Sequence, residues 1–203
     1  GGTGVAIGMS STDPGVNYIL HRGGLPVVGA TVAGTGTAIT FPLQTIAGTY
    51  TVVAKVASFT GCTSNMTGSA TVTIDPLPLV YSVTGGGSYC SGGSGMAVGL
   101  SNSELGVDYQ LYRVTTAVGS PVSGTGSAIS FGLQTVAGTY TVKATNTTTG
   151  CKSNMSGSVA VNILPPPPVY SMTGGGGYCT GAAGANVGLS GSTFGVNYKL
   201  YLG

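Results

Sequence analysis

The chain is 203 residues long, rich in glycine (38 residues), without tryptophan, and only 5% charged. Its net charge of +2 lacks the clustered Lys and Arg with which proteins bind nucleic acid, and no run of about 18 apolar residues could insert into a membrane. We therefore expect no nucleic-acid partner and no membrane insertion in this segment. The hydrophobic fraction of 41% is enough for one buried core in each domain.

Short motifs return at a regular spacing along the chain. Residues 47–52 and 137–142 share the sequence Ala-Gly-Thr-Tyr-Thr-Val, and the motif Gly-Val-(Asn/Asp)-Tyr begins at Gly15, Gly106 and Gly195. The spacings are 91 (106 − 15), 90 (137 − 47) and 89 (195 − 106) residues. A period near 90 is too long for a solenoid repeat and fits a complete small domain. The sequence therefore predicts an array of one repeated module.

Apolar residues that alternate with polar or small ones predict short strands with one buried face. In the first repeat these residues are Val5/Ile7/Met9, Val16/Tyr18/Leu20, Ile39/Phe41/Leu43, Tyr50/Val52/Ala54 and Ala70/Val72/Ile74. In the second they are Met96/Val98/Leu100, Val107/Tyr109/Leu111, Ile129/Phe131/Leu133, Tyr140/Val142/Ala144 and Val159/Val161/Ile163. No segment has a sustained 3.6-residue period, and the abundant Gly and β-branched residues oppose helix formation.

Further strands near residues 80–84 and 118–122 bring the count to about seven per repeat, which predicts an immunoglobulin-like (Ig-like) β-sandwich. Tyr50 and Tyr140 begin the sixth strand, where such domains carry a "tyrosine corner" whose hydroxyl bonds to nearby backbone. Two residues later, Val52 and Val142 occupy the position of a core cysteine in antibody domains. Leu111 stands near the usual tryptophan. From these three residues we expect an aliphatic core without the inter-sheet disulfide.

Proline marks the boundaries between modules. Residues 75–78 (Asp-Pro-Leu-Pro) and 164–168 (Leu-Pro-Pro-Pro-Pro) each follow the last strand of a repeat. Consecutive prolines favour a stiff, extended polyproline spacer, so we expect the modules to lie end to end. We divide the chain into residues 1–75, a repeat without its first strand, residues 76–164, a complete repeat, and residues 165–203, the first strands of a third repeat.

The third piece should leave half a core uncovered, because three strands cannot close a sandwich. We therefore expect its apolar residues to be far more exposed than their counterparts in the second repeat. These residues are Val187, Leu189, Val196, Tyr198 and Leu200.

The combined order of motifs resembles a known family. Tyr89-Cys90-Ser91-Gly92-Gly93 precedes residues 106–112 (Gly-Val-Asp-Tyr-Gln-Leu-Tyr), the Ala-Gly-Thr-Tyr-Thr-Val motif, Gly150-Cys151 and a proline-rich joint. This pattern resembles the tandem repeats of very large Bacteroidota cell-surface adhesins exported by type IX secretion, including the SprB-type adhesins of gliding bacteria. The resemblance implies an extracellular stalk or filament that contacts surfaces, and it supplies no catalytic residues.

The four cysteines recur once per repeat in each of two positions. Cys90 and Cys179 lie before the second strand, and Cys62 and Cys151 follow the sixth. Regular spacing in an exported protein favours disulfides, and paired C-x-x-C spacing for zinc is missing. The pair Cys90–Cys151 would close about 60 residues and stabilise the module by roughly 3–5 kcal/mol. A staple between neighbouring domains is the rival, because an orthodox sandwich places these two loops at opposite ends.

Groupings of residues suited to catalysis or metal binding are nearly absent. His21 is the only histidine and has no base nearby in the sequence. Asp13, Asp75, Glu104 and Asp108 are scattered singly, which argues against a calcium site. The Gly-rich runs after Thr84 and Thr173 lack the Lys-Ser/Thr ending of a phosphate loop and fit strand ends or bulges. We expect no enzymatic activity, no cofactor and no metal.

Two further functions stay open beside the adhesive stalk. Tyr112 and Tyr201 occupy matching outward positions (201 − 112 = 89) and could contact a surface polysaccharide in a carbohydrate-binding module array, although the first repeat has His21 there. Incomplete repeats could instead trade strands between copies in a self-assembling filament. The expected partners are therefore neighbouring repeats of the same long chain, other copies in a filament, or surface polysaccharide.

Overall fold

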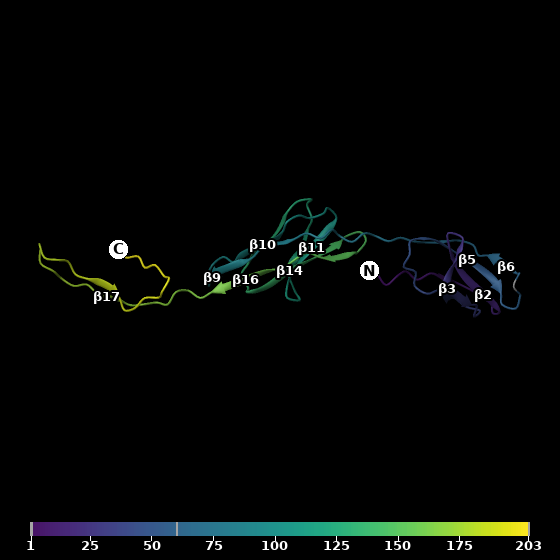
Figure 1. The fold of residues 1–203 in the computed structure, drawn as a ribbon, viewed down its shortest axis with the longest axis horizontal. Coiled ribbons are helices and arrows are strands. Elements are labelled where there is room, and N and C mark those ends of the chain that lie inside the picture. Colours follow the sequence, from purple (N-terminus) through teal and green to yellow (C-terminus); the bar gives the residue numbers. More distant parts are fainter. Residues whose placement is uncertain (1, 60, 203) are drawn as a thin grey trace. The chain divides into compact units, whose positions relative to one another are not determined.

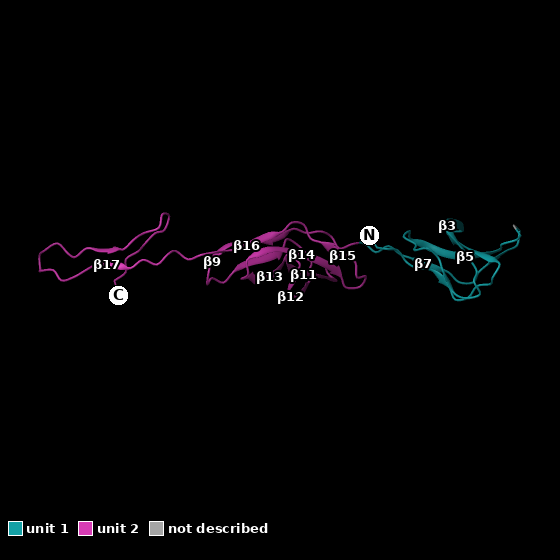
Figure 2. Cartoon of the chain, turned by 90° about the horizontal axis from the view of Figure 1, so that it is seen from below, with its two compact units in different colours: residues 1–76 teal, residues 77–203 magenta. Residues whose placement is uncertain are grey.

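The computed structural model describes residues 2–59 and 61–202, which form β-strands, turns and loops and contain no helix. Two compact units divide the chain, unit 1 at Gly1–Pro76 and unit 2 at Leu77–Gly203 (Figure 2). The all-β prediction is confirmed.

Unit 2 contains a β-sandwich between residues 77 and 164. One sheet has the order β13-β10-β8, and the other has the order β12-β11-β14-β16-β9, with β15 also paired to β14. In chain order the strands are β8 (Val83–Gly85), β9 (Gly87–Cys90), β10 (Met96–Leu100), β11 (Val107–Arg113), β12 (Thr116–Ser123), β13 (Ile129–Gln134), β14 (Gly138–Asn146), β15 (Lys152–Asn154) and β16 (Val159–Leu164). This order is that of an Ig-like sandwich, in which the second and fifth strands share one sheet and the third, sixth and seventh share the other.

The first strand of this sandwich belongs to both sheets. Its first half, β8, pairs antiparallel with β10, and its second half, β9, pairs parallel with β16 (Figure 1). The switch occurs at Gly85, Gly86 and Gly87, which all have positive φ. A Cβ on Gly85 would lie 2.1 Å from the carbonyl oxygen of Ala97, so only glycine fits there. The Gly-rich run is therefore a strand crossover, in line with the strand end or bulge expected from the sequence.

A single core fills unit 2 between its two sheets. Tyr109, Leu111, Tyr140 and Val142 are buried in it, and Phe131 packs against it with its side chain partly exposed. Leu111 and Val142, which occupy the positions of the antibody tryptophan and core cysteine, are buried aliphatic residues, as predicted. The full buried set is Val98, Leu100, Val107, Tyr109, Leu111, Ile129, Tyr140, Val142, Ala144, Met155 and Val161.

The predicted inward faces were wrong near two strand ends. Leu133 is 57% exposed, and Gln134 takes the buried position instead. The register of β13 against β10 shifts in this region, and Gly132 has φ 77°, so the alternation moves by one residue. Ile163 is also exposed, because it lies where β16 runs past β14 and pairs with β9 alone.

Unit 1 repeats most of this arrangement. Its larger sheet has the order β3-β2-β5-β6 with β7 also paired to β5, and β1 pairs with β4. The strands are β1 (Gly8–Met9), β2 (Val16–Arg22), β3 (Leu25–Ala33), β4 (Ile39–Thr40), β5 (Gly48–Val56), β6 (Thr63–Asn65) and β7 (Ala70–Val72). The predictions for Val5, Leu43 and Ile74 were wrong, since all three are exposed and Gln44 is buried. Each of the three lies beyond the end of its strand, outside β1, β4 and β7 respectively. Among the described residues of unit 1, no strand pairs with the outer edge of β1 or of β7.

The tyrosine corner is present in both units. The hydroxyl of Tyr140 donates a hydrogen bond to the carbonyl of Val136 at 2.7 Å, and that of Tyr50 donates to the carbonyl of Ile46 at 2.8 Å. Both rings are buried. The sequence prediction is confirmed, and the repeated Ala-Gly-Thr-Tyr motif therefore has a structural role.

The last part of the chain, residues 165–202, forms only two short strands. β17 (Met172–Gly174) pairs antiparallel with β18 (Val187–Leu189), and all six residues are exposed. Tyr198 is 42% and Leu200 66% exposed, against 0% and 1% for their counterparts Tyr109 and Leu111. The expectation of an uncovered core in this piece is confirmed.

Candidate functional site

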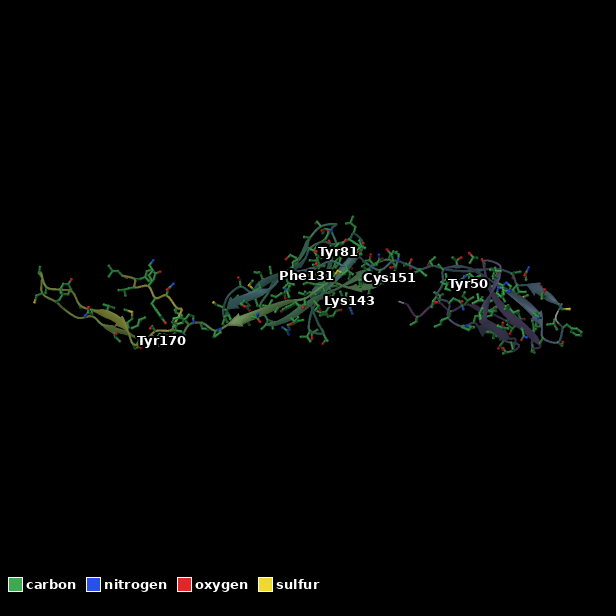
Figure 3. All side chains as sticks on the ribbon, in the orientation of Figure 1. Tyr50, Tyr81, Phe131, Lys143, Cys151 and Tyr170 are labelled. Atoms are coloured by element: carbon green, nitrogen blue, oxygen red, sulfur yellow. The ribbon has the colours of Figure 1, made fainter. Side chains whose placement is uncertain are left out.

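The outer face of the larger sheet of unit 2 carries the first candidate, Tyr112. This residue lies on β11 opposite Thr141 of β14, with its side chain half-buried. The Nζ atom of Lys143 lies 5.7 Å from the centre of the Tyr112 ring, which is cation–π distance (Figure 3 labels Lys143). The two residues line a groove of about 380 Å³ together with Thr141 and Asn154.

Tyr201, the second candidate, also has a lysine beside its ring, but this lysine lies on the same segment of the chain. Lys199 lies with its Nζ 5.0 Å from the Tyr201 ring centre, and the ring is 75% exposed. Lys199 is two residues before Tyr201, so strand alternation alone could have paired them. Lys143 could not be found this way, because β14 meets β11 only in the folded sheet. Sequence reasoning missed both lysines.

Neutral and cationic groups surround Tyr112, and none of the described residues that line its groove is a carboxylate. Because Lys143 lies over the ring, a ligand that stacks on the ring must displace the ammonium group or bind it. An arrangement of one aromatic ring, one ammonium and short polar side chains can hold a sugar ring or an anionic saccharide through stacking and hydrogen bonds.

The turn beside this groove is strained. Val114, which also lines it, has φ 56° and is the only described residue other than glycine with positive φ. A β-branched residue in the left-handed region is a genuine outlier. The corresponding turn of unit 1 has Gly23 at φ 58°, where no side chain opposes the conformation.

His21 lies on β2 at the position that Tyr112 has on β11. Its Nδ1 is 3.2 Å from the carbonyl oxygen of Gly24 in the same hairpin, which fits a local structural contact. Among the residues that the structure describes, no group of three or more His, Cys, Asp or Glu could hold a metal ion.

The four carboxylates have no common site, and two of them bond locally. The Oε2 atom of Glu104 accepts a hydrogen bond from the backbone N–H of Leu79 at 2.6 Å, and the Oδ1 atom of Asp108 accepts one from the hydroxyl of Ser123 at 2.7 Å. The backbone N–H of Glu104 donates to the hydroxyl of Tyr109 at 2.9 Å. Burial raises the pKa of Tyr109. The two Glu104 contacts tie the loop before β11 to Tyr109 and to the segment at Leu79, and the Asp108–Ser123 bond links the paired strands β11 and β12.

Cys90 and Cys151 lie at opposite ends of the sandwich in unit 2. Cys90 pairs with Leu164 at the end of β16, whereas Cys151 lies beyond the far end of β14, where its carbonyl accepts from the N–H of Asn146 at 2.8 Å. The length of β14 between these ends corresponds to roughly 25 Å, while a disulfide needs Cα atoms within about 7 Å. The structure therefore gives the Cys90–Cys151 pairing no support.

The strand order, the buried aliphatic cores and the tyrosine corners define an all-β protein of Ig-like β-sandwich modules. Neither a protein-family model nor a curated protein sequence matches the chain. In the described residues no helix is long and apolar enough to cross a membrane.

Two solved structures are among those with a similar fold. A crystal structure of murine CEACAM1b has a TM-score of 0.37 and 12% identity, over 76% of this chain and 87% of that one. The BSP domain of a biofilm-associated protein has a TM-score of 0.31 and 11% identity, over 81% of this chain and 28% of that one. The fold class rests on the strand order, and these weak likenesses add nothing to it.

Proposed function

We propose that this chain is a structural and adhesive segment of a large bacterial cell-surface protein, in which Ig-like modules joined end to end give reach and attach the cell to surfaces. The proposal includes an extracellular location, export by type IX secretion and a role in gliding, following the sequence resemblance to SprB-type adhesins. It includes no catalytic activity and no cofactor.

One observation carries the proposal: the residues repeated between modules are those that build the fold. Tyr50 and Tyr140 form the tyrosine corners, and Tyr18 and Tyr109 are buried in the two cores. The outward position on the third strand is His21 in the first repeat and tyrosine in the others (Tyr112 and Tyr201), so no one residue recurs there in all three. Repetition of architecture without repetition of a polar site suits a protein whose working property is length.

Labelling of intact cells tests this proposal. Fab fragments raised against unit 2 should stain intact cells of the producing organism, and brief external protease treatment should remove the stain. The same Fab fragments should lower the number of cells that attach to glass or glide on it, whereas Fab fragments against a cytoplasmic protein should not. Staining that requires permeabilised cells would contradict the extracellular location, and unchanged attachment would contradict the adhesive role.

A second function, carbohydrate binding, is favoured by the Tyr112–Lys143 groove. Glycan-array binding by the full chain should then fall at least about tenfold in Tyr112→Ala, because stacking on an aromatic ring supplies much of the affinity of such sites. Phe194→Ala is the matched control, since Phe194 is exposed and does not line the groove. Equal binding by the two variants would remove this candidate.

A further inference from the structure

The polar side chains that line the groove beside Tyr112 have unused hydrogen-bonding groups. Within the part of the chain that the structure describes, no hydrogen bond is formed by the side chains of Tyr112, Thr115, Thr141, Lys143 or Asn154. Elsewhere on the same face the polar groups bond within the protein. Gln110, two residues before Tyr112, donates from its amide to the carbonyls of Leu111 and Val118 at 2.9 and 3.0 Å. The groove therefore holds polar groups that a ligand can bind.

Backbone strain marks the same groove. Val114, which lines it, is 72% exposed and has φ 56°, whereas the corresponding turn of unit 1 has Gly23 at φ 58°. Strained residues gather at binding and catalytic sites, where the strained side chain has a role. A valine in a position that suits glycine adds an apolar wall to the groove, and this is the role that we assign to it.

A lysine accompanies the outward tyrosine in both repeats that have one. The Nζ atoms of Lys143 and Lys199 lie 5.7 and 5.0 Å from the two ring centres (Figure 3 labels Lys143). The first repeat has His21 in place of the tyrosine, and Val53 and Ile19 stand where the two lysines would be (143 − 90 = 53 and 199 − 89 − 91 = 19). The ring and the ammonium group are thus present together or absent together.

The charge around the groove is positive. Lys152 is exposed on β15, which pairs with β14 beside Lys143. Asp108 lies on the same face of β11 as Tyr112 but four residues away, about 13 Å along the strand. Its carboxylate already accepts a hydrogen bond from Ser123. An anionic ligand in the groove would therefore meet an ammonium group without a competing carboxylate beside it.

We propose that the Tyr112–Lys143 groove binds acidic polysaccharide, with a sugar ring on Tyr112 and its carboxylate or sulfate on the Nζ atom of Lys143. A neutral sugar that stacks on the ring must displace the ammonium group and offers it no charged partner. An acidic sugar binds the ammonium group as it moves, through a charge-assisted hydrogen bond. The inference rests on the carbohydrate-binding function proposed above and specifies its ligand class.

Short oligosaccharides with and without charge test the proposal on the full chain. Galacturonate oligomers are compared with their methyl esters, and sulfated dextran oligomers with unsulfated ones, so each neutral form keeps the sugar backbone. The amide resonances of residues 112–115 and 141–143 report on this groove alone. We expect at least one acidic form to shift them and its neutral form to bind at least about tenfold more weakly. Which acidic form binds shows whether the anion is a carboxylate or a sulfate.

Three outcomes of this titration would overturn the proposal. The first is no shift with either acidic oligosaccharide at about 10 mM. The second is equal affinity for the acidic form and its neutral counterpart. The third is equal affinity for a short oligoglutamate peptide, which would mean that the groove binds acidic peptide and does not select a sugar.

A pair of lysine variants separates the groove from the overall charge of the chain. Lys143→Gln should weaken binding of the acidic oligosaccharide at least about tenfold, because it removes the ammonium group that binds the anion. Lys55→Gln is the matched control, since it removes the same charge from β5 of unit 1 and should leave the affinity unchanged. Equal losses in the two variants would overturn the proposal.

Val114→Gly separates binding from folding. Glycine suits the left-handed backbone at this turn, so the variant should stay folded, yet it lacks the apolar wall and should bind at least about threefold more weakly. Unchanged affinity would overturn the role assigned to Val114.

Failure of this inference can be told from failure of the function on which it rests. If acidic and neutral oligosaccharides bind equally and Tyr112→Ala abolishes both, carbohydrate binding stands and the acidic preference is wrong. If neither form binds, both are wrong. Attachment of cells is measured separately, so the adhesive proposal keeps its own experiment.

Discussion

Removing the hydroxyl of Tyr140 tests the structural reading of the repeated motif most directly. Tyr140 is buried, and its hydroxyl donates to the carbonyl of Val136 at 2.7 Å. Tyr140→Phe keeps the ring and its packing but deletes this hydrogen bond. A net hydrogen bond is worth about 0.5–1.5 kcal/mol, and a carbonyl left without its partner costs about 1–3 kcal/mol.

Val136 is half exposed and this hydrogen bond is only part-buried, so we expect water to replace part of the lost donor. We therefore expect Tyr140→Phe to lower the free energy of unfolding of unit 2 by about 1–2 kcal/mol, the lower part of the cost of an unpaired carbonyl. For a module of this size each kcal/mol lowers the Tm by about 4–8 °C.

Urea unfolding of the full chain, combined with hydrogen exchange in β14 and β5, assigns the loss to a unit. Tyr140→Phe should reduce protection in β14 only, and Tyr50→Phe should reduce it in β5 only. Tyr112→Phe is the control, because no hydrogen bond of its hydroxyl is found among the described residues, and its effect should stay within about 0.5 kcal/mol. If Tyr140→Phe behaves like Tyr112→Phe, the tyrosine corner does not stabilise the module and our reasoning is wrong.

For three other changes the structure predicts whether unit 2 becomes more or less stable. Val114→Gly should stabilise unit 2 by about 1 kcal/mol, because it relieves a left-handed valine at the cost of backbone entropy; a lower urea midpoint would contradict this. Gly85→Ala should destabilise unit 2 by at least about 2 kcal/mol, since its Cβ meets the Ala97 carbonyl. Gly92→Ala is the control, as Gly92 has a similar positive φ with open space around it; equal losses would mean that strain, not the clash, dominates. Burial raises the pKa of Tyr109, so above about pH 10 the unfolded phenol ionises before the folded one, and the free energy of unfolding falls as pH rises. Tyr109→Phe should lose less of its stability between about pH 9 and pH 11 than the parent chain, and parallel curves would show that Tyr109 does not control this range.

The sequence could predict only those residues of the candidate site that follow from the alternation within one strand. Tyr112 and Tyr201 follow from alternation and from the 89-residue offset, and Lys199 could have been found in the same way. Lys143 and the groove around Tyr112 depend on the pairing of β11 with β14, which are separated by two intervening strands. The strain at Val114 was equally hidden, because the sequence does not state the φ angle that a hairpin requires.

The fold followed from the sequence in its strand interiors and not at its strand ends. Tyr109, Leu111, Tyr140 and Val142 are buried as alternation predicted, since strands in mid-sheet have neighbours on both sides. Leu133 is exposed because a register shift between β13 and β10 moves the alternation by one residue. Ile163 is exposed because the pairing of β16 with β14 ends at Val161. Periodicity describes one strand, whereas burial depends on what lies across from it.

By itself, the sequence determined the module, its period, its Ig-like class and the position of its tyrosine corners, because these depend on local patterns that recur every 90 residues or so. Tertiary structure alone decided that the Gly85–Gly87 run carries the first strand from one sheet to the other, and that Lys143 lies beside the Tyr112 ring. Each of these depends on which distant segments meet. Strand pairing is a long-range contact between backbone groups that every residue possesses, so side-chain patterns only partly encode it.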